Sequence, residues 1–273
     1  MLCYSTLGLP DWPFGDLCVL LNRFGFDGIE VALTPEQIER SADRKFWREC
    51  ADVASDCDVS ITNFHLGNPR LNPRLGEPSF VHAASNRRHY WIDLARRTAQ
   101  IAESSGCKYV TIASGPADRG SPHEEQWRRL IQGLDDALQD FPSPCQLLVE
   151  HEPEHFIRTT DDLLQLHERT GGRVNVNLDV GHLEVNPEPI GPAIERLGSL
   201  VKNIHLEDIK DHRHQHLLPG EGDIDFGEVR RALTKIHYRG LLTADLYPYA
   251  DRPIPALERA AQAFGPWREE AAS

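Results

Sequence analysis

The sequence predicts an α/β protein built as one closed (β/α)8 barrel, the TIM barrel, over residues 1–273. Two observations support this prediction. Apolar, β-favouring runs alternate eight times with segments of helical periodicity, and no low-complexity linker interrupts them. Polar residues that can bind a metal ion also lie at the ends of four of these runs. Such strand ends converge on one rim if the strands are parallel and the sheet is closed.

The first half of the chain contains four predicted strands. Thr34-Pro35 reads as an N-cap with Pro at the first helical position, so one helix is expected from there to about Ser55. The connection from Gly67 to Pro78 exceeds the usual length of about 2 to 6 residues and is expected to form a lid or substrate loop. The predicted strands cover 2–9, 28–33, 59–66 and 109–114, and the helices cover 14–24, 35–55, 81–105 and 122–140.

The second half repeats the alternation. Thr160-Asp-Asp caps a helix that Gly171-Gly172 ends, and a His-rich loop is expected over 212–216. An open doubly wound sheet would carry a Gly-rich phosphate turn, but the sequence contains neither GxGxxG nor GxxxxGK[ST], which favours the barrel. The predicted strands cover 146–150, 174–179, 201–205 and 240–247, and the helices cover 160–170, 190–197, 227–237 and 254–264.

Composition and charge limit the classes of partner. The formal net charge of -13 disfavours binding to nucleic acids and anionic membranes. No run approaches the roughly 20 apolar residues of a membrane span. The six cysteines form no CxxC pair, which is typical of reduced thiols. We therefore expect a soluble, cytoplasmic protein with a small-molecule ligand, and a homo-oligomer is compatible with the sequence.

Four residues at the ends of strands five to eight form the candidate metal site: Glu150, Asp179, His205 and Asp245. Three carboxylates and one imidazole suit Mn²⁺, Mg²⁺ or Co²⁺, and Zn²⁺ is possible if further histidines contribute. A single carboxylate at a strand end is more often a helix cap or a surface group. Four at corresponding ends predict a bound cation, because the empty site would hold a charge of about -3.

Further polar residues are candidates for substrate binding. His182 follows the sixth strand's carboxylate by three residues and is a substrate hydrogen-bonder, a ligand of a second metal or an orienting group. His65 on strand three has a similar standing. His214 and His216 are candidates for contact with substrate or metal. Arg213 is a candidate anchor for a sugar hydroxyl or phosphate, although it can equally be a solvated loop residue.

These motifs resemble the xylose-isomerase-like TIM-barrel superfamily. The resemblance covers nearly the whole chain and is most specific in His205-Leu-Glu-Asp208 with the downstream Gly220-Glu-Gly-Asp-Ile-Asp-Phe226. The group includes sugar and sugar-phosphate isomerases and epimerases, hydroxypyruvate isomerase, inosose dehydratase and endonuclease IV. By this resemblance, the four strand-end residues hold the metal, and His182 and Arg213 lie near the substrate. Ketose 3-epimerases of this group carry Glu on strand eight, where this chain has the shorter Asp245.

The expected reaction is proton transfer next to the carbonyl of a sugar or keto-sugar through a metal-stabilised enediolate. Glu150 is the expected base, and Asp245 or a histidine returns the proton, giving isomerisation or epimerisation. Loss of a β-hydroxyl or an aglycone instead would make the protein a lyase or dehydratase. The same fold also allows a non-catalytic sugar-binding barrel or an endonuclease, and the acidic composition argues against DNA as substrate.

Overall fold

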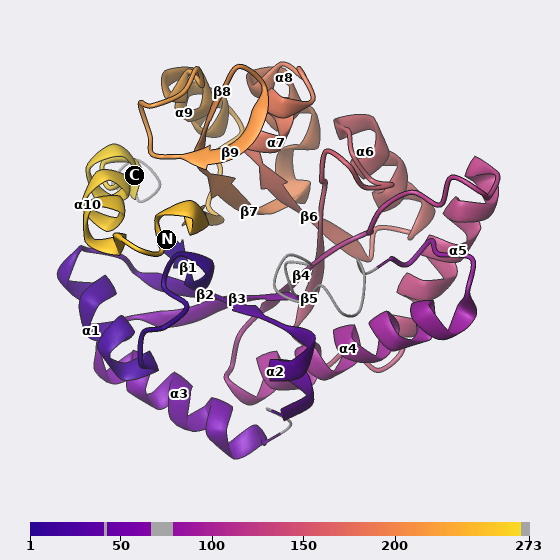
Figure 1. Ribbon diagram of the computed structural model, residues 1–273, viewed down its shortest axis with the longest axis horizontal. Helices are drawn as coiled ribbons and strands as arrows, with labels where there is room; N and C mark the ends of the chain where they lie inside the picture. Colours follow the sequence, from indigo (N-terminus) through magenta and orange to yellow (C-terminus); the bar gives the residue numbers. More distant parts are fainter. Residues whose placement is uncertain (41–42, 67–78, 269–273) are drawn as a thin grey trace. The chain divides into compact units, whose positions relative to one another are not determined.

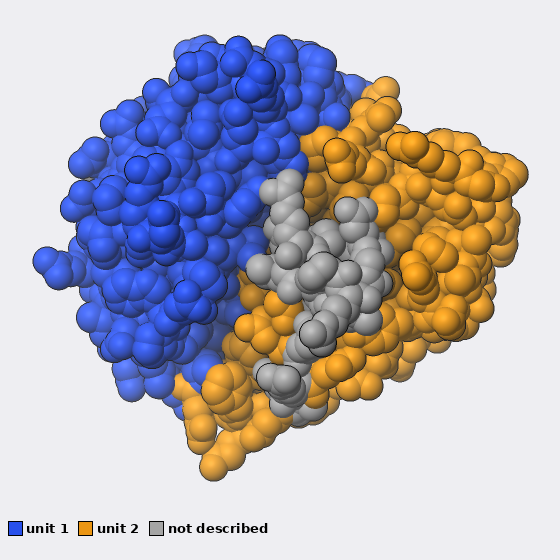
Figure 2. All heavy atoms as spheres, viewed as in Figure 1, with its two compact units in different colours: residues 1–31, 50–62, 177–273 blue, residues 32–49, 63–176 orange. Residues whose placement is uncertain are grey.

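The computed structural model describes residues 1–40, 43–66 and 79–268. These residues form two compact units, which Figure 2 colours separately. Unit 1 contains Met1–Val31, Cys50–Thr62 and Asn177–Ser273, and unit 2 contains Ala32–Glu49 and Asn63–Val176. Of the helices in the described ranges, none combines the length and apolar character that a membrane crossing requires.

Eight strands follow one another in a closed barrel in the order β1-β10-β7-β6-β5-β4-β3-β2 (Figure 1), which confirms the predicted fold class. The pairs β1·β10, β1·β2, β10·β7, β3·β4 and β4·β5 run parallel. The strands are β1 (Leu2–Ser5), β2 (Gly28–Leu33), β3 (Ser60–Leu66), β4 (Tyr109–Ala113), β5 (Gln146–Glu150), β6 (Val174–Asp179), β7 (Val201–Leu206) and β10 (Leu241–Ala244).

Helices connect successive strands, as the hydrophobic periodicity predicts. Helix α6 begins at the N-cap Thr159, whose side chain accepts from Asp162 N while the Asp162 carboxylate accepts from Thr159 N. The helices are α1 (Phe14–Arg23), α2 (Pro35–Arg40), α3 (Arg44–Asp56), α4 (Ser85–Ser104), α5 (His123–Leu138), α6 (Thr160–Arg169), α7 (Val180–Val185), α8 (Ile190–Leu197), α9 (Phe226–Lys235) and α10 (Pro253–Phe264).

Several sequence predictions differ from the structure. The strand predicted over 240–247 ends at Ala244 and is followed by a 3-10 helix (Tyr247–Tyr249), and α7 was not predicted. Strand β1 stops at Ser5, and a 3-10 helix (Thr6–Gly8) follows it. The single helix predicted over 35–55 is two helices, α2 and α3. The expected His-rich loop is a β-hairpin of β8 (Asp208–Lys210) and β9 (Arg213–Leu217), which packs against α7 (Figure 1). The predicted lid, Gly67 to Pro78, lies outside the described residues.

Strand β7 shows how the interior is divided between apolar and polar side chains. Ile204 and Leu206 are fully buried on one face of the strand. Asn203 and His205 alternate with them, and both hydrogen-bond to Glu30 Oε2 from β2. The polar face of β7 therefore carries the functional groups, and its apolar face contributes to the core.

Asp208 organises the segment that carries the most specific motif. Its Oδ2 accepts hydrogen bonds from Gly220 N at 2.8 Å and Gly222 N at 2.9 Å, and its Oδ1 accepts from Ile209 N at 2.9 Å and Ile224 N at 3.2 Å. A Cβ atom on Gly222 would collide with Asp208 Oδ1 and with the backbone of Ile209. The Gly-Glu-Gly motif is thus explained by a turn wrapped around one carboxylate.

Replacing Asp208 with Ala is expected to lower the free energy of unfolding by about 3 kcal/mol, because four backbone donors lose a charged acceptor. Chemical denaturation of the metal-free protein measures this loss. Asp251→Ala, which replaces an exposed aspartate of the same unit, is the control and should change stability by less than about 0.5 kcal/mol. Equal stability of the two variants would contradict the assigned role.

Candidate metal centre

Asp179 lies at the junction of β6 and α7 and is fully buried. Its Oδ1 caps α7 by accepting from His182 N at 2.9 Å. Its Oδ2 lies 3.5 Å from His182 Nε2 and 3.8 Å from His205 Nδ1. Although burial opposes ionisation, the His182 imidazole, Glu207 and His205 hold the pKa of Asp179 well below its usual value. A buried carboxylate oxygen is thus left facing two imidazole nitrogens.

His205 is oriented by the buried carboxylate of Glu30, which lies on β2 in the same unit. Its Nε2 donates to Glu30 Oε2 at 2.9 Å, and both side chains are fully buried. Because a carboxylate only accepts, this contact places a proton on Nε2, and Nδ1 is the ring nitrogen on the side of Asp179. A carboxylate that fixes the tautomer of a histidine is the usual support of a metal ligand.

Replacing Glu30 with Gln is expected to weaken Mn²⁺ binding by about 10-fold or more, because His205 loses the charge that raises its basicity. Isothermal titration calorimetry of the metal-free protein with Mn²⁺ measures this affinity. Glu184→Gln provides the matched control, since Glu184 contacts the exposed His212 at 3.1 Å in the same way. Unchanged affinity in the Glu30 variant, or an equal loss in both variants, would show that Glu30 does not support a metal ligand.

Asp245 directly follows β10 and contacts the hairpin through His216. Its Oδ2 lies 3.6 Å from His216 Nδ1, and its backbone oxygen accepts a hydrogen bond from that nitrogen at 3.0 Å. A carbonyl oxygen only accepts, so His216 carries its proton on Nδ1 and presents the Nε2 lone pair. Burial lowers the pKa of His216 to about 4, so the ring is neutral at pH 7.

Three imidazoles of unit 1 converge on one another. His214 Nε2 lies 3.0 Å from His182 Nε2 and 2.8 Å from His216 Nε2. His214 and His216 share a face of β9 because they are two residues apart in a strand. His216 adopts a φ of +48°, an uncommon backbone conformation that tends to occur at functional sites. This cluster can bind a metal ion or hydrogen-bond the hydroxyl groups of a substrate.

Glu207 is a site residue that the sequence motifs did not single out. It is fully buried, and its carboxyl group hydrogen-bonds to that of Asp179. Glu207, Asp179 and His216 offer ligand atoms within 4.8 Å of one another. Burial, and then the charge of Asp179, raise the pKa of Glu207 well above its usual value. Period-two alternation from His205 was the available signal, since it places Glu207 on the same face of the chain.

Unit 2 contains two of the predicted site residues. Glu150 ends β5, is 1% exposed, and has its Oε2 3.1 Å from His65 Nε2. His65 is on β3 and is buried. The predicted base and the predicted substrate-binding histidine of strand three are therefore neighbours.

Unit 1 brings together Asp179, His182, His205, His214, His216 and Asp245 through the contacts given above. Arg213 begins β9 and is exposed, and strand alternation places its side chain opposite those of His214 and His216. Its role as a substrate anchor remains a prediction. The residues that the structure adds to the candidate site are Glu30 and Glu207.

The sequence was also compared with known proteins. The model of the xylose isomerase-like TIM barrel family matches residues 18–268. The chain belongs to this family. Because the match includes every predicted strand from the second to the eighth, the family assignment agrees with the closed strand order.

The curated proteins that are similar to this chain include an epimerase and a dehydratase. Fructoselysine 3-epimerase of Escherichia coli O157:H7 is 22% identical over 255 residues, which is 89% of each chain. Inosose dehydratase of Clostridium perfringens is 26% identical over 143 residues, or 45% of this chain and 48% of the dehydratase. The match to the dehydratase thus spans about half of its length.

Two solved structures share the fold. A D-psicose 3-epimerase crystallised with D-fructose superposes with a TM-score of 0.78 at 18% identity, over 100% of this chain and 99% of the other. The IOLI protein with a bound zinc atom superposes with a TM-score of 0.75 at 16% identity, over 100% and 98%. Both likenesses show that this chain shares their fold.

Proposed function

We infer that the protein is a divalent-metal-dependent sugar isomerase or epimerase. The proposed ligands are Glu150, Asp179, His205 and Asp245. The observation that carries the proposal is the buried Asp179 Oδ2, which lies 3.5 Å from His182 Nε2 and 3.8 Å from His205 Nδ1. A cation at this point would offset the buried negative charge of the convergent carboxylates, which is costly to keep away from water.

The donors also fit a metal in their chemistry. Carboxylate oxygens with one imidazole nitrogen suit Mn²⁺, Mg²⁺, Co²⁺ or Zn²⁺. The Glu30–His205 hydrogen bond occupies Nε2 of His205, so Nδ1 is the nitrogen that would bind the metal in its deprotonated form. The relative with bound zinc supports a metal on this fold, and we favour Mn²⁺, Mg²⁺ or Co²⁺ because oxygen donors predominate.

The proposed reaction moves a proton next to a sugar carbonyl. A divalent ion held at these residues supplies a Lewis acid that polarises the carbonyl. Glu150 removes the proton from the neighbouring carbon, and its 3.1 Å contact with His65 fixes its carboxylate. Asp245 returns the proton, and its shorter side chain relies on the hairpin contact with His216 for its position.

The imidazole cluster supports a polyhydroxylated substrate. His182, His214 and His216 place ring nitrogens within 3.0 Å of a neighbour, so a hydroxyl group can exchange hydrogen bonds with them. We assign these residues, with His65 and Arg213, to substrate binding. The epimerase relatives named for fructoselysine and psicose support a sugar or keto-sugar as the substrate class.

A lyase or dehydratase is the second candidate, and a specific observation favours it. The half-buried His214 lies between two further imidazoles and can deliver a proton to a leaving hydroxyl. The relatives include inosose dehydratase. The same proton abstraction by Glu150 would then be followed by loss of the β-hydroxyl.

We also propose a cytoplasmic location. All six cysteines are free, which agrees with a reducing compartment.

Incubation with ketoses in D₂O tests the proposed function. The Mn²⁺-loaded protein should wash deuterium into the carbon next to the carbonyl of at least one ketose, and removal of the metal with EDTA should stop the exchange. Recovery of an epimer or isomer supports the first candidate, and recovery of a dehydrated product supports the second. Exchange that persists at the same rate without metal would refute both.

A further inference from the structure

A hydrogen-bond chain in unit 1 runs from β10 through β7 to the carboxylate that orients His205. Thr243 Oγ1 donates to Asn203 Oδ1 at 2.8 Å, and Asn203 Nδ2 donates to Glu30 Oε2 at 3.1 Å. The same oxygen of Glu30 accepts from His205 Nε2 at 2.9 Å. All four side chains are fully buried. The chain therefore links a candidate metal ligand to two residues outside the proposed ligand set.

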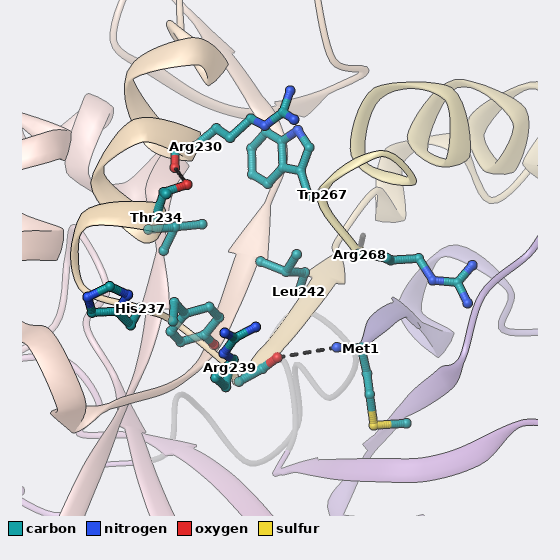
Figure 3. A pocket seen from close by; sticks show the side chains of 11 residues that line it. Met1, Arg230, Thr234, His237, Arg239, Leu242, Trp267 and Arg268 are labelled. Carbon is teal, nitrogen blue, oxygen red and sulfur yellow. Dashed lines mark hydrogen bonds between the residues drawn. The ribbon is translucent and has the colours of Figure 1, made fainter. Parts of the chain in front are cut away.

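Strand pairing places Thr243 on the inner face of the sheet, beside His205. The two residues lie opposite each other in the β10·β7 ladder. Leu242, the neighbour of Thr243 on β10, instead lines a pocket together with Trp267 and residues of α9 (Figure 3). Because successive side chains of a strand point to opposite faces, Thr243 points into the barrel while Leu242 points towards the helices.

The donors and acceptors of the chain fix its direction. A carboxylate only accepts hydrogen bonds, so the Asn203 amide must turn its nitrogen towards Glu30. Its oxygen then faces Thr243, whose hydroxyl donates to it. A flipped amide would set its oxygen against the Glu30 carboxylate, and the hydrogen-bond network excludes that orientation. Thr243 thus orients the Asn203 amide, and the amide in turn orients the carboxylate.

The position of the Glu30 carboxylate matters for the His205 ring. Asn203 and His205 are two residues apart on β7, so their side chains lie on the same face and meet at one oxygen of Glu30. Such hydrogen bonds are strong in a buried site, where no water competes for the donors. Loss of the Asn203 donor would loosen this arrangement, so the ring would be oriented less closely and would be less basic.

We propose that Asn203 and Thr243 are positioning residues of the candidate metal centre. They hold the Glu30 carboxylate against Nε2 of His205, and this contact directs Nδ1 of the ring towards Asp179. Their effect declines along the chain, because Thr243 acts through Asn203. The effect on metal affinity rests on the proposed function, whereas the effect on the His205 ring is a property of the metal-free protein.

Calorimetric titration with Mn²⁺ measures the effect on affinity. Asn203→Leu should weaken binding by about 10-fold, and Thr243→Val, which removes the hydroxyl at nearly constant volume, by about 3-fold. Thr243→Ser keeps the hydroxyl and should bind within about 2-fold of the unaltered protein. Thr111→Val is the matched control, because Thr111 Oγ1 accepts a buried hydrogen bond of 2.8 Å from Asn63 in unit 2. This control should keep its full affinity.

NMR of the metal-free protein, with its histidines labelled with ¹⁵N, tests the positioning directly. The Nε2–H proton of His205 should exchange slowly with water because the ring is fully buried, and His205→Gln assigns its signal. Asn203→Leu and Thr243→Val should shift this signal and speed the exchange, whereas Thr243→Ser and Thr111→Val should not. Loss of stability alone would not give this pattern, since both Val variants break one buried hydrogen bond.

The double variant, Asn203→Leu with Thr243→Val, serves if a single variant does not fold. It leaves no unsatisfied polar group between the two positions, so it should be more stable than Thr243→Val while the Mn²⁺ affinity stays low. Absence of Mn²⁺ binding in the unaltered protein would refute the proposed function, and the His205 signal would then decide the positioning role. An unchanged signal in Asn203→Leu and Thr243→Val, or an equal change in Thr111→Val, would overturn the proposal.

Discussion

Replacement of Glu150 with Gln is expected to reduce the exchange of substrate hydrogen with D₂O by at least about 1,000-fold. A glutamine cannot accept the proton, and a positioned general base contributes about 10² to 10⁴ to the rate. The amide keeps the size of the side chain and one oxygen that can act as a donor to metal. Mn²⁺ binding should therefore survive in weakened form, and the exchange assay isolates the loss of the base.

Glu152→Gln is the matched control for this experiment, because it makes the same chemical change two residues further along the chain. Glu152 is half-buried beyond the end of β5. Its variant should exchange at the rate of the unaltered protein. Full exchange in the Glu150 variant would assign the base to another residue, and the buried Glu207 would then be the first to examine.

The second large effect is expected at Asp179. Asp179→Asn should weaken Mn²⁺ binding by about 100-fold or more, because loss of one buried charged partner typically costs about 3 to 5 kcal/mol. Asparagine preserves the N-cap of α7, since its side-chain oxygen can still accept from His182 N. The helix should therefore remain intact, and the loss can be assigned to ligation.

A cap outside the site controls for any structural effect of this change. Asp225 caps α9 by accepting from Gly227 N at 2.8 Å and Glu228 N at 3.1 Å, and it is exposed. Asp225→Asn should bind Mn²⁺ like the unaltered protein. Equal metal affinity in both variants, measured by calorimetry or by metal content after dialysis, would exclude Asp179 as a ligand.

The barrel was predictable because its signals are local. Strands β5 and β6 have the predicted limits and end at the polar residues Glu150 and Asp179. The hairpin β8·β9 was not predicted, because polar side chains such as Arg213 and His214 hide a strand that is paired through its backbone. Its turn depends on left-handed backbone at Asp211 and His212, which no Gly announces.

The candidate site was only partly predictable. Asp179, His205 and Asp245 could be predicted because they lie at the ends of predicted strands, and a closed parallel barrel brings these ends together on one rim. Glu30 could not be recognised, because its role depends on a contact with His205 across 175 residues of sequence. The same holds for the convergence of His182 with His214, which depends on the hairpin folding back over α7.

The most direct test of the central claim is a crystal of the protein grown or soaked with Mn²⁺ and measured for anomalous scattering at the manganese edge. The account predicts a peak bonded to Asp179 Oδ2 and His205 Nδ1, with further bonds to Glu150 and Asp245. A peak elsewhere in unit 1, or no peak at a Mn²⁺ concentration that saturates binding in solution, would contradict it.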